Sequence, residues 1–365
     1  MVTSKTSKVK PAGLPAYPIV SGRGVVEKLA AYLPDRASRA VLIADEKVDA
    51  IHGDRVVALL EKNLPLIRLT FPAGEESKAR RRKEKIENAM IDAGLGRDCV
   101  VVALGGGVTL DLAGFTAATY MRGIPTLLVP TSLLAMVDAA IGGKTGVNTK
   151  RGKNLIGAFH HPRAVIADMD FLKTLPHDEI PNGLAEMAKA GIVADRAFFT
   201  ALASEGPLRL MDGDKAALFI ARGIAIKAEI VSRDAGERDL RQVLNFGHTV
   251  GHAIEKATDY SLPHGMAVAL GMAAESRIAV EAGILPAAEQ RLLIKGLRAL
   301  GLPADLEKRR ILSTLPQLMK KDKKSRRGEL RFSLPEAIGR MAHGEDGTFT
   351  VPVEPALVDS VLQRR

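Results

Sequence analysis

Two of the eight histidines in this chain lie four residues apart, in the stretch NFGHTVGH from Asn245 to His252. On a helix, residues at i and i+4 share one face, and two histidines placed in this way can bind a metal ion. The zinc-protease pattern HExxH has a glutamate directly after the first histidine, but Thr249 stands there. The stretch is therefore a poor match to a protease. It remains either part of a metal site or an ordinary helix.

A polar stripe extends this pair, provided that residues 240–256 form one helix. Spacings of 4, 3 and 4 place four polar side chains within a narrow arc: Arg241, Asn245, His248 and His252. The opposite side of the helix carries Val243, Val250 and Ile254. A solvated stripe is the alternative, and Glu255 and Lys256 beside the arc support it. Solvated faces are usually Lys and Glu, however, whereas Arg, Asn and His bind anions and metals, so the geometry leaves both interpretations open.

Two further segments supply residue types that a metal site needs. Glu186 and Lys189 lie at i and i+3 among apolar or small residues, where a charge is costly unless it is paired or bound. His264 follows His252 by twelve residues. One glutamate and two histidines form a known ligand set for catalytic zinc with an open coordination position. Each position alone is more often structural, but together they favour a metal site.

A glycine-rich segment, ALGGGVTLDLAGF, follows a predicted strand and opens a predicted helix. Gly105, Gly106 and Gly107 allow the backbone to approach a diphosphate at the helix N-terminus, where free N–H groups favour anions. The spacing meets the dinucleotide fingerprint GxGxxG only in part, so a tight turn without a ligand is the equal alternative. Acidic residues near two other strand ends, Asp45 and Glu75, can accept hydrogen bonds from ribose hydroxyls and favour a nucleotide.

The first half of the chain alternates short apolar runs with amphipathic segments. We predict buried strands at residues 40–45, 67–71, 99–107, 126–131 and 164–170. Helical periodicity between these runs indicates a parallel sheet covered on both faces. Strand signals become sparse after about residue 178. We therefore expect an α/β domain over residues 1–178, with a mobile lead-in over 1–16, and a mainly helical domain over 179–365.

The composition, 46% hydrophobic and 26% charged, is that of a globular protein with ample core. No run approaches about 18 uninterrupted apolar residues, and the basic N-terminus lacks the apolar core of a secretory signal. We therefore expect no membrane association. The single cysteine, Cys99, excludes an internal disulfide and fits a reducing compartment, so we expect a cytoplasmic protein.

The net charge of +10 indicates nucleic acid, an anionic membrane or an anionic substrate as the partner. The densest basic run, KKDKKSRR at residues 320–327, is equally well explained as a solvated loop. Aromatic residues are only 4% of the chain and Trp is absent, so platforms for base stacking are scarce. The charge therefore favours a small anionic substrate over nucleic acid.

Six segments occur in the order of the motifs of the 3-dehydroquinate synthase family, which the chain resembles from about Asp45 to Gly339. They are GGGVTLDLAGFTAATYMRG, VPTSLLAMVDAAIGGKTGVN, GKNLIGAFHHP, GLAEMAKAG, LNFGHTVGHAIE and HGMAVALGM. The patterns VDxxxGGKTGVN and LNxGHTxGHAIE are specific to the sugar-phosphate cyclase superfamily.

The resemblance implies a doubly wound, Rossmann-like parallel-sheet domain that binds NAD+, followed by a mainly helical metal-binding domain. It implies a phosphorus–oxygen lyase that converts 3-deoxy-D-arabino-heptulosonate 7-phosphate to 3-dehydroquinate and phosphate, in the shikimate pathway. The expected course is transient oxidation by NAD+, phosphate elimination, re-reduction and intramolecular aldol closure. The implied metal is Zn2+, with Co2+ as the alternative.

The resemblance also assigns site residues. The implied metal ligands are Glu186, His248 and His264. The implied cofactor contacts are Asp45, Glu75, Lys78, Gly106, Gly107, Val108, Asp111, Thr131, Ser132, Leu134, Asp138, Lys144, Lys153 and Thr174. The implied substrate contacts are Arg122, Lys144, Asn154, Lys227, Arg241, Asn245, Lys323 and Lys324. The implied catalytic residues are Asp138, Lys144, Lys189, Asn245 and His252.

Three positions carry further expectations. His252 is a candidate proton relay, one helical turn after the ligand His248. Arg122 matches a residue that reaches the phosphate bound by a neighbouring subunit, which implies a homodimer. Met266 stands where the family usually has Glu, so support of the His264 segment is expected to differ.

Three alternative functions remain. Another sugar-phosphate cyclase would act on a substrate without a carboxylate, and such relatives commonly change the positions of Lys227, Arg241 or Asn245, all of which are kept here. A metal-dependent polyol dehydrogenase would release NADH, and the cluster of anion-binding residues argues against it. A nucleic-acid binder rests on residues 320–327 alone.

Overall fold

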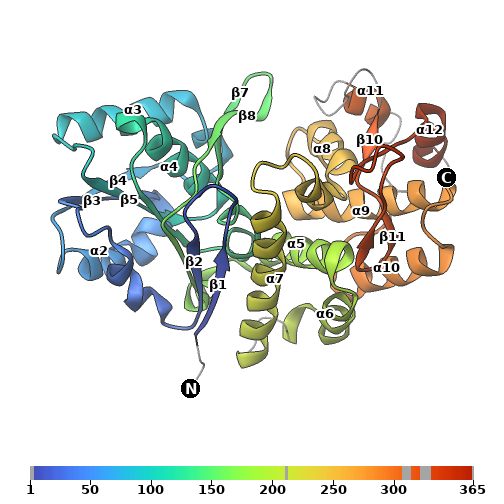
Figure 1. The fold of residues 1–365 in the computed structure, drawn as a ribbon, viewed down its shortest axis with the longest axis horizontal. Coiled ribbons are helices and arrows are strands. Elements are labelled where there is room, and N and C mark those ends of the chain that lie inside the picture. Colours follow the sequence, from blue (N-terminus) through green and yellow to red (C-terminus); the bar gives the residue numbers. More distant parts are fainter. Residues whose placement is uncertain (1–3, 210–212, 306–313, 321–329, 364–365) are drawn as a thin grey trace. The chain divides into compact units, whose positions relative to one another are not determined.

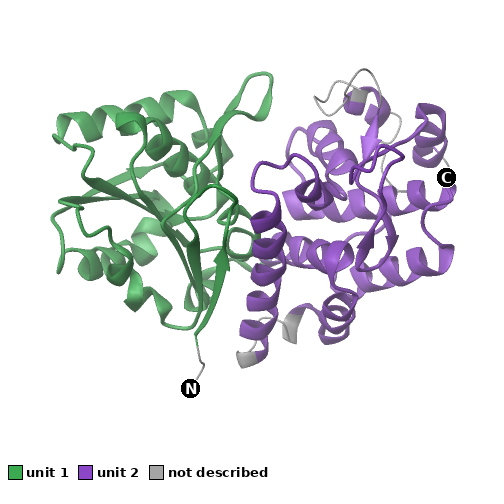
Figure 2. Ribbon diagram, in the orientation of Figure 1, with its two compact units in different colours: residues 1–177 green, residues 178–365 purple. Residues whose placement is uncertain are grey.

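The computed structural model describes residues 4–209, 213–305, 314–320 and 330–363. The chain divides into two compact units, Met1–His177 and Asp178–Arg365 (Figure 2). The first unit is built on a parallel sheet and the second is mainly helical, as expected from the change in pattern near residue 178. Each unit has its own core, and each is described by itself below.

Seven strands form the sheet of the first unit, in the order β1-β2-β9-β6-β5-β3-β4 (Figure 1). The strands are β1 Lys5–Val9, β2 Tyr17–Gly22, β3 Arg39–Asp45, β4 Leu66–Phe71, β5 Cys99–Gly105, β6 Thr126–Pro130 and β9 Ala164–Asp168. All pairings are parallel except that of β1 with β2. The five predicted strands are confirmed. The residues of β5 are fully buried, which is why it is an uninterrupted apolar run.

Helices cover this sheet and connect its strands. They are η1 Val25–Tyr32, α1 Glu46–Val48, η2 Asp49–Gly53, α2 Asp54–Leu60, η3 Glu75–Ser77, α3 Arg80–Asp92, α4 Gly107–Thr119, η4 Tyr120–Arg122, η5 Ala135–Ala139 and η6 Met169–Thr174. From β3 the chain crosses to β4 on one side and then to β5 on the other, so the winding reverses between β3 and β5. Ligands of doubly wound sheets bind at this reversal, outside the carboxyl ends of the strands.

The expectation of a mobile lead-in over residues 1–16 is wrong for Lys5–Val9. This segment pairs antiparallel with β2, from Lys5 opposite Ser21 to Val9 opposite Tyr17. Val9 and Tyr17 are buried and anchor the pair. The segment was missed because KTSKV has only one strongly apolar residue, and an edge strand needs less burial than a central one.

A two-stranded hairpin, β7 Lys144–Thr149 and β8 Gly152–Phe159, was not predicted either. It carries two predicted substrate contacts, Lys144 and Asn154. Asn148 attaches the hairpin to the segment before α3: its backbone N–H donates to the Lys78 carbonyl at 2.7 Å and its side-chain amide donates to Glu75 at 2.6 Å. The hairpin therefore lies against the predicted cofactor residues of the same unit.

The second unit consists mainly of helices. They are η7 His177–Glu179, α5 Ile180–Ala194, α6 Arg196–Arg209, α7 Gly213–Arg233, η8 Leu240–Asn245, α8 His248–Ala257, α9 His264–Glu281, α10 Ala287–Ala299, α11 Leu315–Lys320 and α12 Pro355–Gln363. Two small sheets pair β10 Arg331–Phe332 with β13 Val351–Pro352, and β11 Pro335–Ala337 with β12 Arg340–Met341. Among the described residues, no helix is both long enough and apolar enough to span a membrane.

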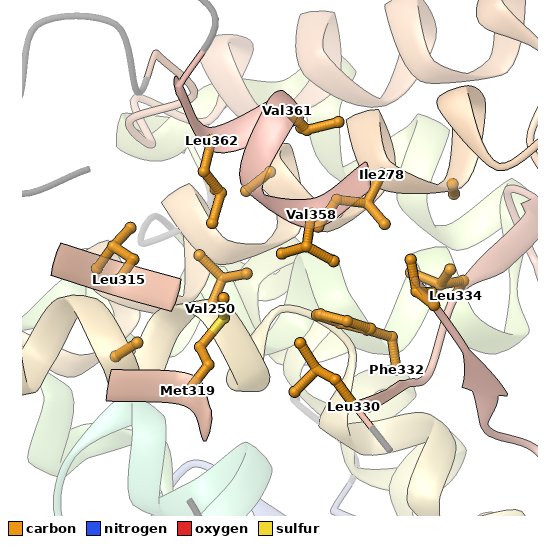
Figure 3. Packing of buried hydrophobic residues seen from close by; sticks show 14 of the residues in the cluster. Val250, Ile278, Leu315, Met319, Leu330, Phe332, Leu334, Val358, Val361 and Leu362 are labelled. Carbon is orange, nitrogen blue, oxygen red and sulfur yellow. The ribbon is translucent and has the colours of Figure 1, made fainter. Parts of the chain in front are cut away.

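An apolar cluster fixes one face of α8 (Figure 3). Val250 and Ile254 of α8 are fully buried there against Ile278 of α9 and Phe332 of β10. The opposite face of α8 carries His248 and His252, so the predicted division into an apolar and a polar side is confirmed. Burial of the apolar side determines which way the histidines point.

Residues 240–256 do not form one helix, which was the condition for the polar stripe. The 3-10 helix η8 ends at Asn245, Phe246 is extended, and Gly247 has a φ of 79°, after which α8 begins at His248. A left-handed φ favours glycine, and a Cβ at Gly247 would lie 2.5 Å from the Met272 side chain. The sequence pattern could not reveal this break, because the stripe keeps its spacing across it.

Candidate functional site

Three side chains from separate helices meet in the second unit. Glu186 lies within α5, His248 is the first residue of α8, and His264 is the first residue of α9. The Nε2 atoms of His248 and His264 lie 3.5 and 3.6 Å from the same Glu186 oxygen, Oε1. One donor atom from each residue lies within 4.8 Å of the other two. The structure thus brings together the three residues expected to bind metal.

Close approach of helix backbones makes this meeting possible. A Cβ added to Gly271 of α9 would lie 1.9 Å from the Gly247 carbonyl, directly before α8. A Cβ added to Gly265, next to His264, would lie 2.4 Å from the Asn182 Cα in α5. Only glycine allows such separations, so the backbones next to the two histidines are held against α9 and α5.

A buried carboxylate completes the start of α8. Glu275, in the middle of α9, is fully buried and accepts hydrogen bonds from the backbone N–H groups of Gly247 at 2.7 Å and Val250 at 2.9 Å. Gly247 itself supplies no side-chain cap. Glu275 therefore takes the place of an N-cap residue, and it ties the position of His248 to α9.

The carboxylate of Glu186 fits a metal ligand. Its side chain is 1% exposed, and neither of its oxygens accepts a hydrogen bond within the described part of the chain. It forms an ion pair with Lys189, one turn along α5. A buried carboxylate without hydrogen bonds is costly. A divalent cation at the two Nε2 atoms would satisfy it, and the donor set of two imidazoles and one carboxylate is that of catalytic zinc.

Each of the two imidazoles directs Nε2 at Glu186 because its Nδ1 has another partner. Nδ1 of His248 lies 3.3 Å from the Phe246 carbonyl, and Nδ1 of His264 lies 3.3 Å from Oε2 of Glu255. Burial lowers the proton affinity of His264, but the carboxylates of Glu186 and Glu255 outweigh it and raise its pKa to about 10. The negative potential that holds a proton there also attracts a metal cation.

Glu255 argues against the alternative of a solvated stripe. That alternative places Glu255 in solvent, but it is 3% exposed and faces His264. Its position explains this, because His248, His252 and Glu255 follow at i, i+4 and i+7 and therefore share one helix face. That spacing was the signal available in the sequence. The role of Glu275 left no comparable signal.

Other predicted site residues of this unit are buried cations. Lys189, Lys227 and Arg241 are 2%, 7% and 1% exposed. They come from α5, α7 and η8, three elements that pack against one another. The Asn245 amide donates to Glu237 at 3.1 Å. The His252 ring lies edge-on to His248, with 5.3 Å between centroids. Lys323 and Lys324 lie outside the described residues.

In the first unit, the glycine turn has the geometry of an anion site. Helix α4 begins at Gly107 directly after β5, and Gly106 provides no side-chain cap. The first N–H groups of α4 therefore have no side-chain acceptor from the cap. Asp45, at the end of the neighbouring strand β3, accepts a hydrogen bond from Thr109 at 3.3 Å. The two strand ends on either side of the winding reversal thus meet at this turn.

Lys78 connects three predicted site residues. Its Nζ donates to Asp111 and to the side-chain oxygen of Asn154, each at 2.5 Å. Burial raises the pKa of Asp111, and the charge of Lys78 opposes the rise. Asn154 has a φ of 53° in the hairpin, a rare conformation that is tolerated where the surroundings hold it. Lys153 extends toward Glu75, with its Nζ 3.9 Å from the carboxylate.

The remaining predicted positions are more dispersed. Thr131 donates its N–H to the Gly105 carbonyl and so adjoins the glycine turn, whereas Ser132 caps the following turn at Ala135. Thr174 makes hydrogen bonds to His52 and to the Phe171 carbonyl, neither of which is a predicted cofactor residue. Arg122 is exposed and has a φ of 67°. Val108, Leu134 and Asp138 lie in or beside α4 and η5.

Two family models match the chain in succession. The model described as 3-dehydroquinate synthase N-terminal matches residues 68–182, and the model described as 3-dehydroquinate synthase C-terminal matches residues 183–325. A curated relative, the 3-dehydroquinate synthase of Symbiobacterium thermophilum, is 43% identical over 335 residues, which are 89% of this chain and 92% of that protein.

Solved structures of two other synthases are similar to this chain along its length. A 2-deoxy-scyllo-inosose synthase complexed with carbaglucose-6-phosphate, NAD+ and Co2+ is 26% identical with a TM-score of 0.88, over 98% of this chain and 99% of the other. The 2-epi-5-epi-valiolone synthase of Streptomyces hygroscopicus with NAD+ and Zn2+ bound is 28% identical with a TM-score of 0.84, over 98% of each chain. With both family models matched and close relatives along most of its length, the chain belongs to the 3-dehydroquinate synthase family.

Proposed function

We propose that this protein is a 3-dehydroquinate synthase: it converts 3-deoxy-D-arabino-heptulosonate 7-phosphate to 3-dehydroquinate and phosphate. The observation that carries the proposal is the buried cluster of Glu186, His248 and His264, in a chain that matches the family along most of its length. The cluster supplies a metal donor set, and the same unit supplies buried cations for an anionic substrate. The reaction belongs to the shikimate pathway.

The chemistry requires two bound groups. When bound, NAD+ would supply an acceptor and donor of hydride for carbon 5, and a divalent cation would supply a Lewis acid for the oxygen on that carbon. The glycine turn at the start of α4 fits the diphosphate of a dinucleotide, since its N–H groups lack a side-chain cap. Glu186, His248 and His264 would hold the cation. We propose Zn2+ as that cation, because two imidazoles and a carboxylate match the ligand set of catalytic zinc, with Co2+ as the alternative.

The buried cations bind the substrate. A seven-carbon keto-acid phosphate carries a carboxylate and a phosphate, and both must leave water. Lys227 and Arg241, on elements that pack together, are placed to neutralise an anion that no solvent shields. Asn245, Lys144, Asn154 and one of Lys323 and Lys324 would complete these contacts. Asp138 and Lys189 would act beside the reacting carbons.

His252 would move a proton. It lies on the same face of α8 as His248, one turn further along, and its ring contacts that of His248 edge-on. An imidazole at this distance from the metal ligands can relay the proton of the carbon-5 hydroxyl. We expect His252→Asn to lower turnover at saturating substrate while the metal stays bound. Unchanged turnover in this variant would show that the relay is elsewhere.

Two further features of the proposal concern the setting of the enzyme. Arg122 is exposed and, together with Met121 and Gly123, has a positive φ. A strained, exposed arginine suits contact with a phosphate held by a second copy of the chain, so we propose a homodimer. The one cysteine is buried and free, which fits the reducing cytoplasm. Location and assembly both stay predictions.

The decisive experiment measures phosphate release from the seven-carbon substrate by purified protein supplied with NAD+. We expect release that a chelator abolishes and added Zn2+ or Co2+ restores, without accumulation of NADH. Net NADH formation would instead indicate a polyol dehydrogenase. Turnover of a sugar phosphate that lacks the carboxylate, in preference to the keto acid, would indicate another cyclase. In that case Arg241→Ala should affect neither substrate, whereas for a synthase it should raise KM for the keto acid.

A further inference from the structure

We propose that Glu255 is a positioning residue for the metal centre: its carboxylate accepts the Nδ1 proton of His264 and so directs Nε2 of that ring at the cation. The inference rests on the proposed function, since it presumes the cation at Glu186, His248 and His264. It assigns a residue that lies outside this ligand set, and it concerns metal affinity rather than turnover.

The first observation is the asymmetry between the two imidazoles. Both direct Nε2 at Glu186, but they differ in what holds Nδ1. A backbone carbonyl, that of Phe246, lies beside the His248 ring, whereas a buried carboxylate, that of Glu255, lies beside the His264 ring. A carbonyl orients a ring, but a carboxylate also makes it a stronger donor, because negative charge on the far nitrogen raises the basicity of the near one.

The second observation is burial. The side chain of Glu255 is 5% exposed, and that of His264 is 31% exposed. A carboxylate withdrawn from water in this way requires a donor or a positive charge nearby. The His264 ring meets that need when its Nδ1 carries a proton, and the ring then has only Nε2 left to offer to a metal. The contact between Glu255 and His264 thus determines both the orientation of the His264 ring and which of its nitrogens carries the proton.

The third observation concerns the helix ends. His248 and His264 are the first residues of α8 and α9, so each lies at the positive end of a helix. Helix N-termini disfavour a cation. Glu275 offsets this effect at α8, where it accepts two backbone N–H groups. At α9 the cap residue Pro263 makes no side-chain hydrogen bond, and the Gly265 N–H donates instead to the neutral side-chain oxygen of Asn182 at 2.8 Å. Glu255 supplies the missing negative charge beside α9.

A competing arrangement has to be separated from this one. Donor atoms of His252, Glu255 and His264 also lie within 4.8 Å of one another, so Glu255 could itself be a ligand of an ion held by that second trio. If such an ion took Nδ1 of His264, that nitrogen could not also carry the proton that Glu255 accepts. The two arrangements therefore predict different donor sets, and a spectroscopic readout can distinguish them.

The test measures Zn2+ and Co2+ affinity by competition with a chromophoric chelator, on full-length protein freed of metal. Glu255→Gln should weaken binding about 10- to 100-fold, the range typical of outer-shell partners. Glu255→Asp, which keeps the charge one methylene further away, should recover part of the loss. Glu281→Gln is the matched control: the same substitution, exposed, at the far end of α9, where affinity should not change.

The Co2+ absorption spectrum then identifies the donor set. With Glu255 outside the set, Co2+-saturated Glu255→Gln should show the parent spectrum, and His252→Asn should keep parent affinity. An altered spectrum in Glu255→Gln, or a large affinity loss in His252→Asn, would assign the ion to the second trio and overturn the proposal. Parent affinity in Glu255→Gln would overturn it as well.

Two further measurements keep the outcomes distinct. Glu186→Gln should lose Co2+ binding regardless of Glu255, so that retained binding there would refute the metal site itself rather than the role of Glu255. Thermal unfolding of each metal-free variant shows whether the fold is intact. If Glu255→Gln does not fold, Glu255→Asp alone is used for the test. In that case, metal affinity equal to that of the parent protein in Glu255→Asp, together with the same loss of metal to excess chelator, contradicts the proposal.

Discussion

The glycine turn of the first unit and the metal cluster of the second are built by opposite means. At the turn, backbone N–H groups at the start of α4 make the candidate site, and residues close in sequence supply them. In the cluster, side chains from α5, α8 and α9 make the site, and the backbone matters only because it approaches so closely. The site at the glycine turn therefore depends on the space that a glycine without a side chain leaves for a ligand. The metal cluster depends instead on close packing of the helices that carry its side chains.

The strongest way to break the cluster is to remove the carboxylate that both imidazoles face. Glu186→Gln keeps the shape of the side chain but removes the charge that offsets the cation. Metal affinity should fall by more than about 100-fold, because even outer-shell partners account for losses of that size. Phosphate release should fall to background. Metal content after dialysis checks the prediction, with Glu281→Gln as the control that should retain parent content.

Gly271→Ala tests the close packing of α9 against the start of α8. The added Cβ would lie 1.9 Å from the Gly247 carbonyl and 2.8 Å from the Gly251 nitrogen, so α8 and α9 must separate. Overpacking of this kind costs about 1–3 kcal/mol or more of unfolding free energy. Denaturant unfolding should show that loss together with weaker metal binding, because His248 moves with α8. If Gly271→Ala is as stable as the parent protein, the backbones of α8 and α9 do not pack this closely.

The matched substitution at the glycine turn should behave differently. A Cβ at Gly106 meets only Ser132 Oγ, at 3.6 Å, and its φ of −77° is ordinary for alanine. Gly106→Ala should therefore keep its stability within about 0.5 kcal/mol, because the added Cβ meets no close contact. Its Kd for NAD+ should rise about tenfold, corresponding to about 1.4 kcal/mol. Equal affinity for NAD+ would place the diphosphate away from this turn, and the comparison between the two sites would fail.

A smaller effect concerns pH. Burial raises the pKa of Asp111 and Lys78 opposes it, so Lys78→Met should raise that pKa further. A carboxyl whose pKa is higher in the folded state loses stability as pH rises above its ordinary range, because the unfolded chain releases the proton sooner. The deficit of Lys78→Met against the parent should thus be greater at pH 8 than at pH 4, by urea unfolding. A deficit that does not change between these pH values would contradict the coupling.

The same contrast explains what the sequence could predict. The glycine turn was recognisable because strand, glycines and helix are contiguous. Strands such as β5 were predicted because buried parallel strands are continuous apolar runs. Edge strand β1, strand β2 and the β7–β8 hairpin were not predicted: β1 and the hairpin are not buried on both faces, and the apolar run within β2, YPIVSG, is short. In the metal cluster, the residue types indicated a metal site, but their positions in the sequence did not show which of them lie close together. Motif resemblance, rather than spacing, selected His264 as the partner of His248.

Glu255 and the break at Gly247 show where pattern reasoning stops. The spacing from His248 to Glu255 placed both on one face, but which face is buried depends on α9, which periodicity within α8 cannot reveal. At Gly247 a side chain would meet Met272, and the N–H donates to Glu275; both partners are distant in sequence. Both features depend on tertiary contacts that the pattern within α8 does not contain.

Helix α9 carries His264 at its first residue and, at Glu275, the carboxylate that accepts the amides of Gly247 and Val250. His264 and the carboxylate that holds the start of α8, and with it His248, are therefore eleven residues apart on one helix, about 16 Å at the usual rise of 1.5 Å per residue. We therefore expect thermal displacement of α9 to move both rings together. Hydrogen exchange at the Gly247 and Val250 amides should accordingly follow the local opening of α9 rather than that of α8.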